Sequence, residues 1–554
     1  PVFETDALGR PIVVDGAMYV PTSFGRVVAL DAETGRTRWV FDTRAWEAGR
    51  PTNLGYNTRG VGYWEGNGKQ RIFFATNDSY LWSLDAANGQ PDSAFGNDGR
   101  VDLSQGLGRE IDKKLYGVVS PALVTNNKVI VNSVVFDVPR SKEMPPGHVR
   151  AFNPETGELE WMFKTIPQAG EFGNETWEDG SWEYSGNTNS WTIMSADDEL
   201  GIAYIPIGTP TNDWYGGLRK GDNLFAESLV AVDVNTGERI WHFQMVHHGV
   251  WDYDLPAAPT LVDITVDGRP IKAVAVISKQ GFTYVFDRVT GDPVWPIEER
   301  EVPQSSVSGE RLSLTQPFPT KPDAFEPQGI SDETLIDFSS ELRQEALQNI
   351  EEFDYGPLFT PPSLRGAIQF PGWAGGGEWH GAAFDPETGL YYIPSASSPI
   401  VVALVEARRE RQGMGYVRGG ARSVSGPQGL PLIKPPYGRN PDNTAFAFDM
   451  YAVMGPMSRT VSDAAMMQNI LCGPHPLDNA SIRPKYFLPK SYDEIKGLKI
   501  AWSIDLNFFE VDEHVRTNTM KTLDVLKGLG AELVEVDFGW SAKADRAAQN
   551  YLDH

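Results

Sequence analysis

One short phrase recurs along the N-terminal part of this chain and constrains its fold more than any other feature. It reads ALDAETGRTRWVF from Ala29, AFNPETGELEWMF from Ala151, AVDVNTGERIWHF from Ala231 and VFDRVTGDPVWPI from Val285, with a weaker copy, SLDAANGQ, from Ser83. Each copy joins an apolar strand end to an Asp or Asn and then to a Thr-Gly or Asn-Gly turn. Glycine supplies the positive φ of a tight turn and the Asx side chain closes it, so the phrase predicts a β-hairpin.

The tryptophan that ends each full copy is expected to dock on a neighbouring element. Self-similarity of this kind, with several strands between copies, is typical of a β-propeller. An irregular β-sandwich with coincidental hairpins is the alternative, and the near-identity of the full copies argues against it.

Composition agrees with an all-β chain and excludes several classes of protein. The 554 residues include 16 Trp, 55 Gly and 40 Pro, which favours many short strands joined by turns. A net charge of −26 argues against nucleic-acid binding. The single cysteine, Cys472, excludes an internal disulfide, a CxxCH haem site and a Cys-rich zinc site.

The sequence contains no run of about 18 apolar residues that could span a membrane. It begins with Pro1 rather than Met, so we expect a processed chain or a fragment. Membrane association is therefore expected only through a segment that is not in this chain.

The stretch MVHHGVWDYDLP, from Met245 to Pro256, combines adjacent histidines with spaced aspartates. Such residues serve as metal ligands, as a catalytic base, or simply as a solvated turn. The stretch follows the hairpin that ends in Trp241, so it is expected at a blade-to-blade connection, where propellers present residues to the central axis.

The phrase A-x-[DN]-x-x-T-G-x-x-x-W resembles the tryptophan-docking motif of quinoprotein dehydrogenases, eight-bladed propellers that carry pyrroloquinoline quinone (PQQ) on the axis. MVHHGVWDYDLP is similar to the catalytic segment of membrane-type PQQ glucose dehydrogenases. The resemblance implies that Asp252 is the general base and that Lys279, in ISKQGFTYVFDR, hydrogen-bonds the quinone. A carboxylate can take the hydroxyl proton while hydride leaves for the quinone, and a cation stabilises the negative charge that develops there.

The same resemblance implies a set of cofactor-binding residues. Trp191, in GNTNSWTIMSADDELGIAYIPIG, would form the floor under the cofactor ring, and Asn189 lies in the same segment. Arg59, in YNTRGVGYW, would pair with the carboxylates of PQQ, and Trp379, in GGGEWHGAAFDPETGLYYIP, would flank the ring. The histidine that the family often places just upstream of Arg59 is missing.

Three oxygen donors are implied as metal ligands: Asp137, Thr211 and Asp252. Hard oxygen ligands suit Ca²⁺, with Mg²⁺ or a lanthanide as alternatives. Asp254, two residues after the implied base, marks lanthanide-using relatives but is also found in glucose-type members, so it leaves the metal open.

Two absences narrow the type of enzyme. A single cysteine rules out the vicinal cysteine pair of the alcohol and methanol dehydrogenases, and no CxxCH haem domain is encoded. The resemblance therefore implies a glucose or sugar-alcohol type enzyme of the periplasm, which oxidises a sugar or alcohol and passes electrons to ubiquinone or a cytochrome.

The resemblance to quinoproteins covers residues 1–439, with the last blades missing, and a different family follows. Residues 440–554 resemble an α/β fragment of the amidase-signature enzymes. GPMSRTVSDA, from Gly455, predicts a helix that Thr460 and Asp463 cap, and GLKIAWSIDL, an amphipathic helix and AELVEVDF predict a β-α-β unit. The Gly-Ser-rich catalytic motif of that family is absent, so we expect no amidase activity. A genuine fusion and an artefactual join of two polypeptides both remain open.

Two other functions are weighed against the dehydrogenase. A non-catalytic propeller scaffold, or an inactive chimeric fragment, would need no axial base and cation. Amide hydrolysis would need the missing serine and lysine residues.

Overall fold

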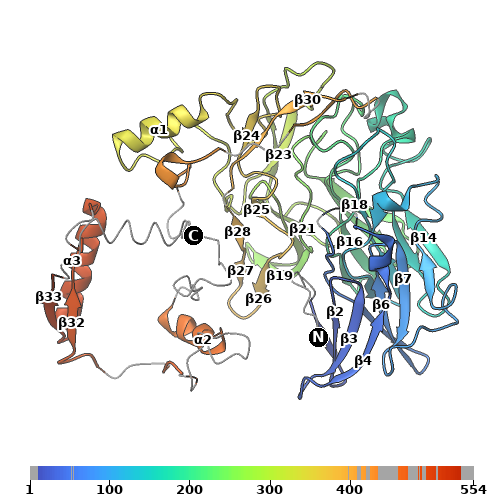
Figure 1. The fold of residues 1–554 in the computed structure, drawn as a ribbon, viewed down its shortest axis with the longest axis horizontal. Coiled ribbons are helices and arrows are strands. Elements are labelled where there is room, and N and C mark those ends of the chain that lie inside the picture. Colours follow the sequence, from blue (N-terminus) through green and yellow to red (C-terminus); the bar gives the residue numbers. More distant parts are fainter. Residues whose placement is uncertain are drawn as a thin grey trace. The chain divides into compact units, whose positions relative to one another are not determined.

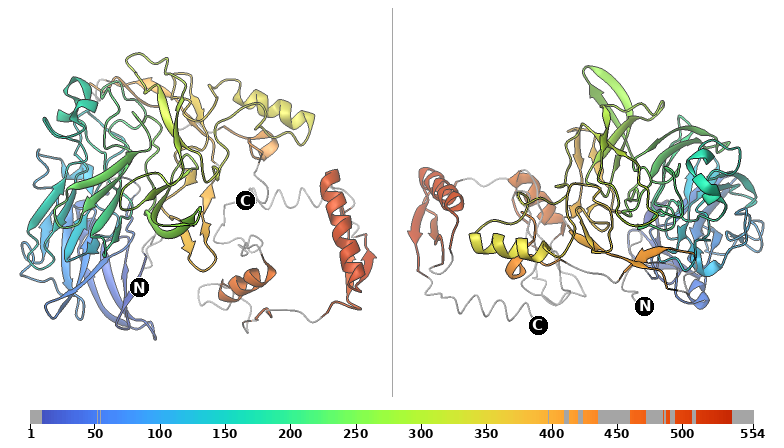
Figure 2. Two further views of the ribbon diagram at one scale, coloured as in Figure 1. Left: turned by 180° about the vertical axis from the view of Figure 1, so that it is seen from behind. Right: turned by 90° about the horizontal axis from the view of Figure 1, so that it is seen from above.

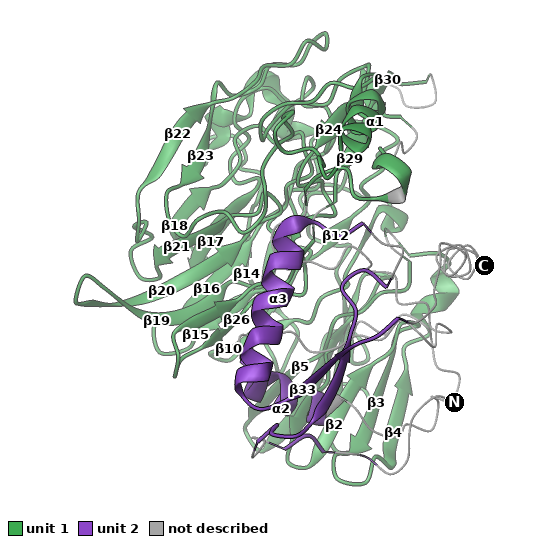
Figure 3. Cartoon of the chain, turned by 90° about the vertical axis from the view of Figure 1, so that its left-hand side faces the viewer, with its two compact units in different colours: residues 1–441 green, residues 442–554 purple. Residues whose placement is uncertain are grey.

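The structure is a computed structural model. It describes residues 10–434 except 52, 54, 397, 409–412 and 420–423, and residues 460–471, 485, 487–489, 494–506 and 510–537. The chain divides into two compact units, residues 1–441 and 442–554 (Figure 3). The predicted boundary after Arg439 lies outside the described residues.

Unit 1 is built from antiparallel sheets that follow one another along the chain, from the blue to the green parts of Figures 1 and 2. The first four sheets have four strands each, hydrogen-bonded in chain order. They consist of β1 (Ile12–Val14), β2 (Ala17–Pro21), β3 (Arg26–Asp31) and β4 (Thr37–Asp42); β5 (Gly62–Gly66), β6 (Lys69–Ala75), β7 (Tyr80–Asp85) and β8 (Arg100–Asp102); β10 (Leu123–Thr125), β11 (Lys128–Val131), β13 (Val149–Phe152) and β14 (Leu159–Phe163); and β15 (Ser195–Asp197), β16 (Ile202–Pro206), β17 (Ser228–Asp233) and β18 (Arg239–Gln244).

Smaller sheets complete the described part of unit 1. The fifth sheet has three strands, β19 (Thr260–Val266), β20 (Arg269–Ile277) and β21 (Thr283–Asp287). Two-stranded pairs are β9 (Tyr116–Gly117) with β12 (Val134–Val135), β22 (Ile297–Glu301) with β23 (Thr315–Pro319), β24 (Ala367–Gln369) with β29 (Ile400–Val402), β25 (Gly376–Gly377) with β28 (Ser395–Ala396), β26 (Ala383–Asp385) with β27 (Leu390–Tyr392), and β30 (Leu404–Glu406) with β31 (Tyr416–Arg418). The helices are α1 (Ser340–Ile350) and the short 3₁₀ turns η1 (Ala45–Ala48), η2 (Lys113–Leu115), η3 (Asn174–Thr176), η4 (Glu178–Glu183) and η5 (Pro427–Gly429).

Successive sheets meet through their first strands. β5 contacts β10, β10 contacts β15, β15 contacts β19, and β19 contacts β26. Sheets that touch through their first strands fan out from a common centre, as the blades of a β-propeller do.

Side chains that alternate along each strand fill the layers between neighbouring sheets. On β6, Ile72 and Phe74 pack with Ala29 of the first sheet, whereas Phe73 packs with Val129 of the third. The same alternation continues through the fourth and fifth sheets. Both faces of a central strand are thus buried, which explains the apolar runs IFFA in β6, IAYIP in β16 and AVAVI in β20.

The tryptophan of a repeat docks on the next sheet, as the sequence predicts. In three of the four full copies the indole N–H donates a hydrogen bond to the carbonyl that follows the turn aspartate of the next copy: Trp39 to Ala86 (3.0 Å), Trp161 to Val234 (2.8 Å) and Trp241 to Arg288 (3.2 Å). The ring also covers the turn glycine of that copy. A Cβ on this glycine would lie 2.4 Å from the ring of Trp39 at Gly89, 2.5 Å from Trp161 at Gly237 and 2.6 Å from Trp241 at Gly291.

The weak copy at Ser83 has no tryptophan, and other residues make the connection to the third sheet. The Arg71 guanidinium donates to the carbonyl of Pro154, which has the same place in its phrase as Ala86. The backbone N–H of Gly96 donates to the carbonyl of Thr156 at 2.8 Å. A buried arginine and a loop therefore replace the indole.

The fold is mostly β-sheet with few helices, as expected. Within the described residues, four sheets of four strands are followed by a three-stranded sheet and by strand pairs. The total of eight blades stays a prediction.

Unit 2 contains the elements predicted from its sequence. α2 (Val461–Leu471) begins at the expected capping box, in which the N–H of Asp463 donates to Thr460 Oγ1 at 3.1 Å. β32 (Lys499–Trp502) and β33 (Glu532–Glu535) pair in parallel, and α3 (Glu513–Gly528) connects them. That this β-α-β unit is an amidase-like structure stays a prediction.

Candidate active site

The predicted site residues come from loops at one end of the sheets. Arg59, Trp191 and Asp252 lie in the connections from the fourth strand of one sheet to the first strand of the next, after β4, β14 and β18. Lys279 lies in the turn between β20 and β21, the second and third strands of the fifth sheet. Because antiparallel strands alternate in direction, these connections and this turn emerge at the same end of the sheets.

Lys279 joins two aspartates of the MVHHGVWDYDLP stretch. Its Nζ donates to the carbonyl oxygen of Asp252 at 2.9 Å, to Asp252 Oδ1 at 3.1 Å and to Asp254 Oδ2 at 3.1 Å. The lysine side chain is only 6% exposed. Asp252 has a φ of +55°, in the left-handed region that few non-glycine residues adopt, and this conformation lets its carbonyl and carboxylate face one ammonium.

The two aspartates differ in their electrostatic surroundings. Burial raises the pKa of Asp252 well above its usual range, although Lys279 opposes the shift. Burial acts on Asp254 in the same sense, but the charge of Lys279 and a hydrogen bond from the Thr209 N–H outweigh it and lower its pKa to about 2. Burial would lower the pKa of Lys279, yet the two carboxylates raise it. The Lys279 charge thus stabilises both carboxylates, and Asp254, which also accepts from the Thr209 N–H, is the more strongly stabilised as the anion.

Trp191 lies beside two cations. The Lys279 ammonium is 5.9 Å from the centre of its ring and the Arg59 guanidinium is 5.0 Å away. Arg59 also lies 5.4 Å from the ring centre of Trp379. The structure thus brings together Asp252, Lys279, Trp191, Arg59 and Trp379.

Arg59 and the backbone of Trp191 are held by further bonds. The carbonyl of Trp191 accepts hydrogen bonds from Ser120 Oγ at 2.7 Å and from Arg59 Nη1 at 3.3 Å. Arg59 is 2% exposed, and desolvation lowers its pKa to about 10 although Glu378 partly offsets this. A cation this poorly solvated is ready to pair with an anion.

Asp137, a predicted metal ligand, is bonded to neighbouring amides rather than to Asp252. Its Oδ1 accepts from Asn187 Nδ2 at 3.3 Å, and its N–H donates to Asn53 Oδ1 at 3.0 Å. The residue as a whole is exposed, while desolvation of its carboxyl group and the charge of Asp254 raise its pKa to about 7.

Thr211, another predicted metal ligand, is buried, and its Oγ1 has no hydrogen-bond partner among the described residues. The described part of the chain contains no group of three or more His, Cys, Asp or Glu side chains arranged to hold a metal ion. The ligand set of Asp137, Thr211 and Asp252 stays a prediction.

The segment that carries Trp191 has buried polar atoms without partners. Within the described residues these are Asn187 Oδ1, Thr188 Oγ1, Ser190 Oγ and Thr192 Oγ1, and Arg59 Nε is a further one beside them. Asn189 is 2% exposed, and its carbonyl accepts from the Gly208 N–H at 2.8 Å. Buried polar groups are normally satisfied, so this set suits a polar ligand. An indole face, two cations and unpaired polar atoms fit a planar polyanion such as PQQ.

Sequence reasoning missed two buried acids near this centre. Desolvation and the charges of Asp137 and Asp254 raise the pKa of Asp213 well above its usual range. Desolvation and Asp254 raise the pKa of Glu227 to about 8, and its Oε1 accepts from Thr209 Oγ1 at 3.1 Å. Asp213 stands only two residues after Thr211, which is the signal that could have found it.

No helix among the described residues is long and apolar enough to cross a membrane. A family model described as the β-propeller domain of glucose/ethanol/alcohol dehydrogenases (PQQ) matches residues 4–449. A second model, described as Amidase, matches residues 428–552.

Individual relatives agree with the first model. The glycerol dehydrogenase large subunit of Gluconobacter oxydans is 32% identical over 411 residues, which cover 72% of this chain and 54% of the relative. The quinoprotein glucose dehydrogenase of Escherichia coli is 31% identical over 411 residues, covering 71% of this chain and 50% of the relative. In three dimensions, a quinohemoprotein alcohol dehydrogenase of Pseudomonas putida superposes with a TM-score of 0.54 at 26% identity, covering 74% of this chain and 55% of that one.

This chain spans about half the length of the relatives it matches. The match to the PQQ propeller model nevertheless covers most of unit 1, including all the residues gathered around Lys279. The chain belongs to the family of PQQ-dependent glucose/ethanol/alcohol dehydrogenase β-propellers.

Proposed function

We propose that unit 1 binds PQQ and oxidises a hydroxyl group of a sugar or alcohol. The observation that carries the proposal is the position of Lys279, which is within 3.1 Å of carboxylate oxygens of both Asp252 and Asp254 and 5.9 Å from the centre of the Trp191 ring. A scaffold propeller has no use for a buried cation between two acids beside an indole.

PQQ, when bound, supplies a quinone that accepts hydride from the substrate carbon. Trp191 offers a flat apolar face for the ring, and Arg59 offers a forked cation for its carboxylates. Lys279 would stabilise negative charge on the quinone oxygens. Asn189 and Trp379 complete the proposed cofactor-binding set.

Asp252 is the residue that takes the substrate proton in this proposal, and Asp254 is its ionised neighbour. Two titratable groups whose pKa values are pushed apart take different roles, and here burial raises the pKa of Asp252 while Lys279 keeps that of Asp254 at about 2. Asp254 shares the Lys279 ammonium with Asp252, and a substrate hydroxyl would approach the Asp252 carboxylate.

Asp137, Thr211 and Asp252 are the proposed ligands of a divalent or trivalent metal. The unpaired Oγ1 of buried Thr211 supports this set, since a hard cation is bound by oxygen donors. Ca²⁺ is the first candidate, with Mg²⁺ and a lanthanide as the alternatives.

The substrate class follows from the relatives, whose names include glycerol and glucose dehydrogenases. We propose a sugar or alcohol substrate, ubiquinone or a cytochrome as electron acceptor, and a periplasmic location.

The test is to load the purified full chain with PQQ and Ca²⁺ and to follow reduction of an artificial dye with glucose, glycerol and ethanol. Asp252→Asn should lose activity by about a hundredfold or more because proton removal is lost. Asp263→Asn, at an aspartate whose side chain is 74% exposed, is the matched control and should keep full activity.

Retention of the PQQ absorbance after gel filtration separates cofactor binding from catalysis. A chain that retains no PQQ and reduces no dye with any substrate would favour the scaffold or the inactive fragment. Equal activity of the Asp252→Asn variant and the parent would remove Asp252 from the reaction.

A further inference from the structure

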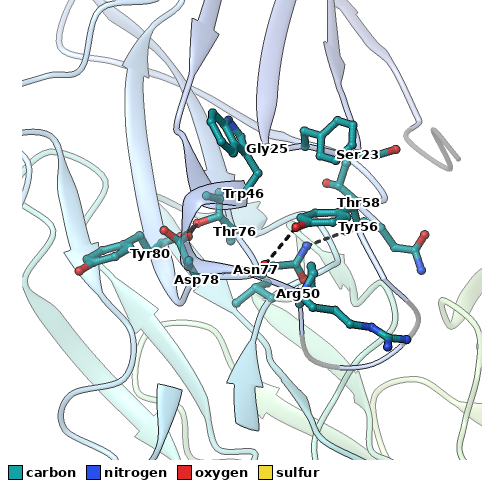
Figure 4. Close-up of a pocket in the computed structure, with 18 of the residues that line it drawn as sticks. Ser23, Gly25, Trp46, Arg50, Tyr56, Thr58, Thr76, Asn77, Asp78 and Tyr80 are labelled. Carbon is teal, nitrogen blue, oxygen red and sulfur yellow. Dashed lines mark hydrogen bonds between the residues drawn. The ribbon is translucent and has the colours of Figure 1, made fainter. Parts of the chain in front are cut away.

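A cavity of about 360 Å³ lies between the first two sheets of unit 1 (Figure 4). Thr58, the neighbour of Arg59 in the chain, is one of its lining residues. Its walls come from the turn between β2 and β3, the connection that includes η1, the turn between β6 and β7, and η2. This volume is in the range of small-molecule sites. None of Asp252, Lys279 and Trp191 lines it.

Aromatic rings and small residues shape the cavity. Trp46 is 41% exposed and stands at one side, and Tyr56 packs against Phe24 with ring centres 4.8 Å apart. Ala45 and Ala75 are buried and leave room at the base. An exposed indole beside a small-residue floor offers a stacking surface for a ring-shaped ligand.

Two polar atoms of the wall have no partner within the described residues. They are Ser23 Oγ and Asn77 Oδ1, both buried from solvent, and Ser23 as a whole is 5% exposed. The Nδ2 of Asn77 donates to the carbonyl of Asn57 at 3.2 Å, which fixes the amide orientation and leaves its oxygen as a free acceptor. Ser23 Oγ and Asn77 Oδ1 are therefore the two wall atoms whose hydrogen bonds the described part of the protein does not supply.

The charges around the cavity argue against a charged ligand. Arg50, Lys113 and Lys114 disfavour a cation, and Asp78 and Asp112 disfavour an anion. Lys113 is itself engaged, since its Nζ donates to Asp102 at 2.7 Å. A quinone ring carries only acceptor oxygens and would leave Asn77 Oδ1 unpaired.

We propose that this cavity binds a neutral, hydroxyl-rich ring such as a pyranose. Its hydroxyl groups would donate to Asn77 Oδ1 and to the Asp78 carboxylate and exchange hydrogen bonds with Ser23 Oγ, while its C–H face stacks on Trp46. The site is separate from the proposed redox centre and goes beyond the proposed function.

The cavity wall leads directly to the redox centre. Thr58 and Val118 line the cavity, and one residue further along each segment the N–H of Arg59 donates to the carbonyl of Val119 at 2.8 Å. A sugar that restricts the motion of Thr58 and Val118 would therefore also restrict the backbone of Arg59, which packs on Trp191.

The test is calorimetry and saturation-transfer NMR on the full chain without PQQ or metal, with D-glucose as the probe. D-glucosamine and D-glucuronate are charged analogues of the same ring, and a water-soluble benzoquinone represents the rival ligand. We expect saturable binding of glucose, and weaker binding of both charged sugars and of the quinone.

Three variants test whether glucose binds in this cavity. Trp46→Ala should weaken it about fivefold or more through loss of stacking. Ser23→Ala should weaken it about threefold without loss of stability, because the hydroxyl has no partner to lose. Phe338→Ala removes another exposed ring, 69% exposed, and should change nothing.

Asp252→Asn distinguishes this site from the redox centre, because glucose binding in the cavity should survive it. Glucose affinity that is unchanged in Trp46→Ala and Ser23→Ala, or lost only in Asp252→Asn, would overturn the proposal. So would tighter binding of the benzoquinone than of glucose, or the absence of saturable glucose binding.

Discussion

At the scale of single residues, the main feature is one buried ammonium shared by two carboxylates. The Lys279 side chain is 6% exposed, and those of Asp252 and Asp254 are 19% and 13% exposed. Such charges are tolerated because each is paired; removing one partner leaves the others desolvated and uncompensated. Stability and the proposed catalysis therefore depend on the same nitrogen atom.

Lys279→Met should destabilise unit 1 by about 3 kcal/mol, since Asp254 loses its counter-charge. Adding Asp254→Asn to it should recover part of that loss, whereas dye reduction should stay absent in both variants. Urea unfolding and the PQQ assay measure the two effects. Full stability of Lys279→Met on its own would contradict the ion pair.

His148 gives a prediction on pH dependence. It is 3% exposed, its Nδ1 accepts from the Thr165 N–H at 3.2 Å, and burial, helped by nearby cations such as Arg109, lowers its pKa to about 3. In the unfolded chain His148 is therefore protonated below about pH 6.5, whereas in the folded chain it is protonated only below about pH 3. Stability should fall as pH falls through this window, by about 1 kcal/mol per pH unit from this residue.

His148→Asn keeps an acceptor for Thr165 and removes the titration. Unfolding in urea between pH 4 and 6 should show a shallower loss of stability in this variant than in the parent. Identical slopes would mean that His148 titrates alike in both states.

At the scale of elements, the docked tryptophans link one sheet to the next. Gly237 has a φ of +71°, and a Cβ there would lie 2.5 Å from Trp161. Gly35 occupies the same place in its phrase with a φ of +69°, and a Cβ there would have nothing within 4 Å. The two positions differ in the ring contact and share the backbone conformation.

Gly237→Ala should therefore lower the free energy of unfolding by about 3 kcal/mol, because alanine is strained in the left-handed backbone conformation and its Cβ displaces the indole. Gly35→Ala is the matched control and should cost about 1 kcal/mol from the backbone alone. Chemical denaturation of both variants gives the difference between the two losses of stability, which is the contribution of the ring contact. Equal losses would show that the ring contact contributes nothing.

The hairpins and their docking were predictable because each depends on a local phrase. The replacement of the missing tryptophan by Arg71 was not, because that arginine lies upstream of its copy and meets Pro154 only in three dimensions. Around Lys279, the proximity of Asp252 and Trp191 follows from family resemblance. Glu227 was missed because its burial is set by tertiary packing and no local pattern marks it, whereas Asp213 could have been found from its place two residues after Thr211.

At the scale of the whole molecule, the chain joins two compact units of different character. The hydrophobic clusters of the described residues are built from residues of unit 1 alone. A chain that ends at Pro441 should therefore keep the thermal unfolding transition of unit 1. Calorimetry on the full and shortened chains checks this, and loss of the transition on shortening would show that unit 2 is needed.

Unit 2 should not hydrolyse amides, because residues 440–554 lack the Gly-Ser-rich motif that bears the catalytic serines of amidases. Release of ammonia from simple aliphatic and aromatic amides measures this. If the full chain and a chain containing unit 1 alone both release ammonia, a contaminant is the source. If the full chain releases ammonia and unit 1 alone does not, the expectation is contradicted.

Tryptophan docking in this molecule has a direction. Each indole is supplied by one sheet and received by the next, at Ala86, Val234 and Arg288. During synthesis on the ribosome, the first, third and fourth sheets therefore each carry an indole with nowhere to bind until the next sheet has emerged. Completion of these sheets should lag one repeat behind translation, and a ribosome that stalls just after one of them would leave its tryptophan exposed.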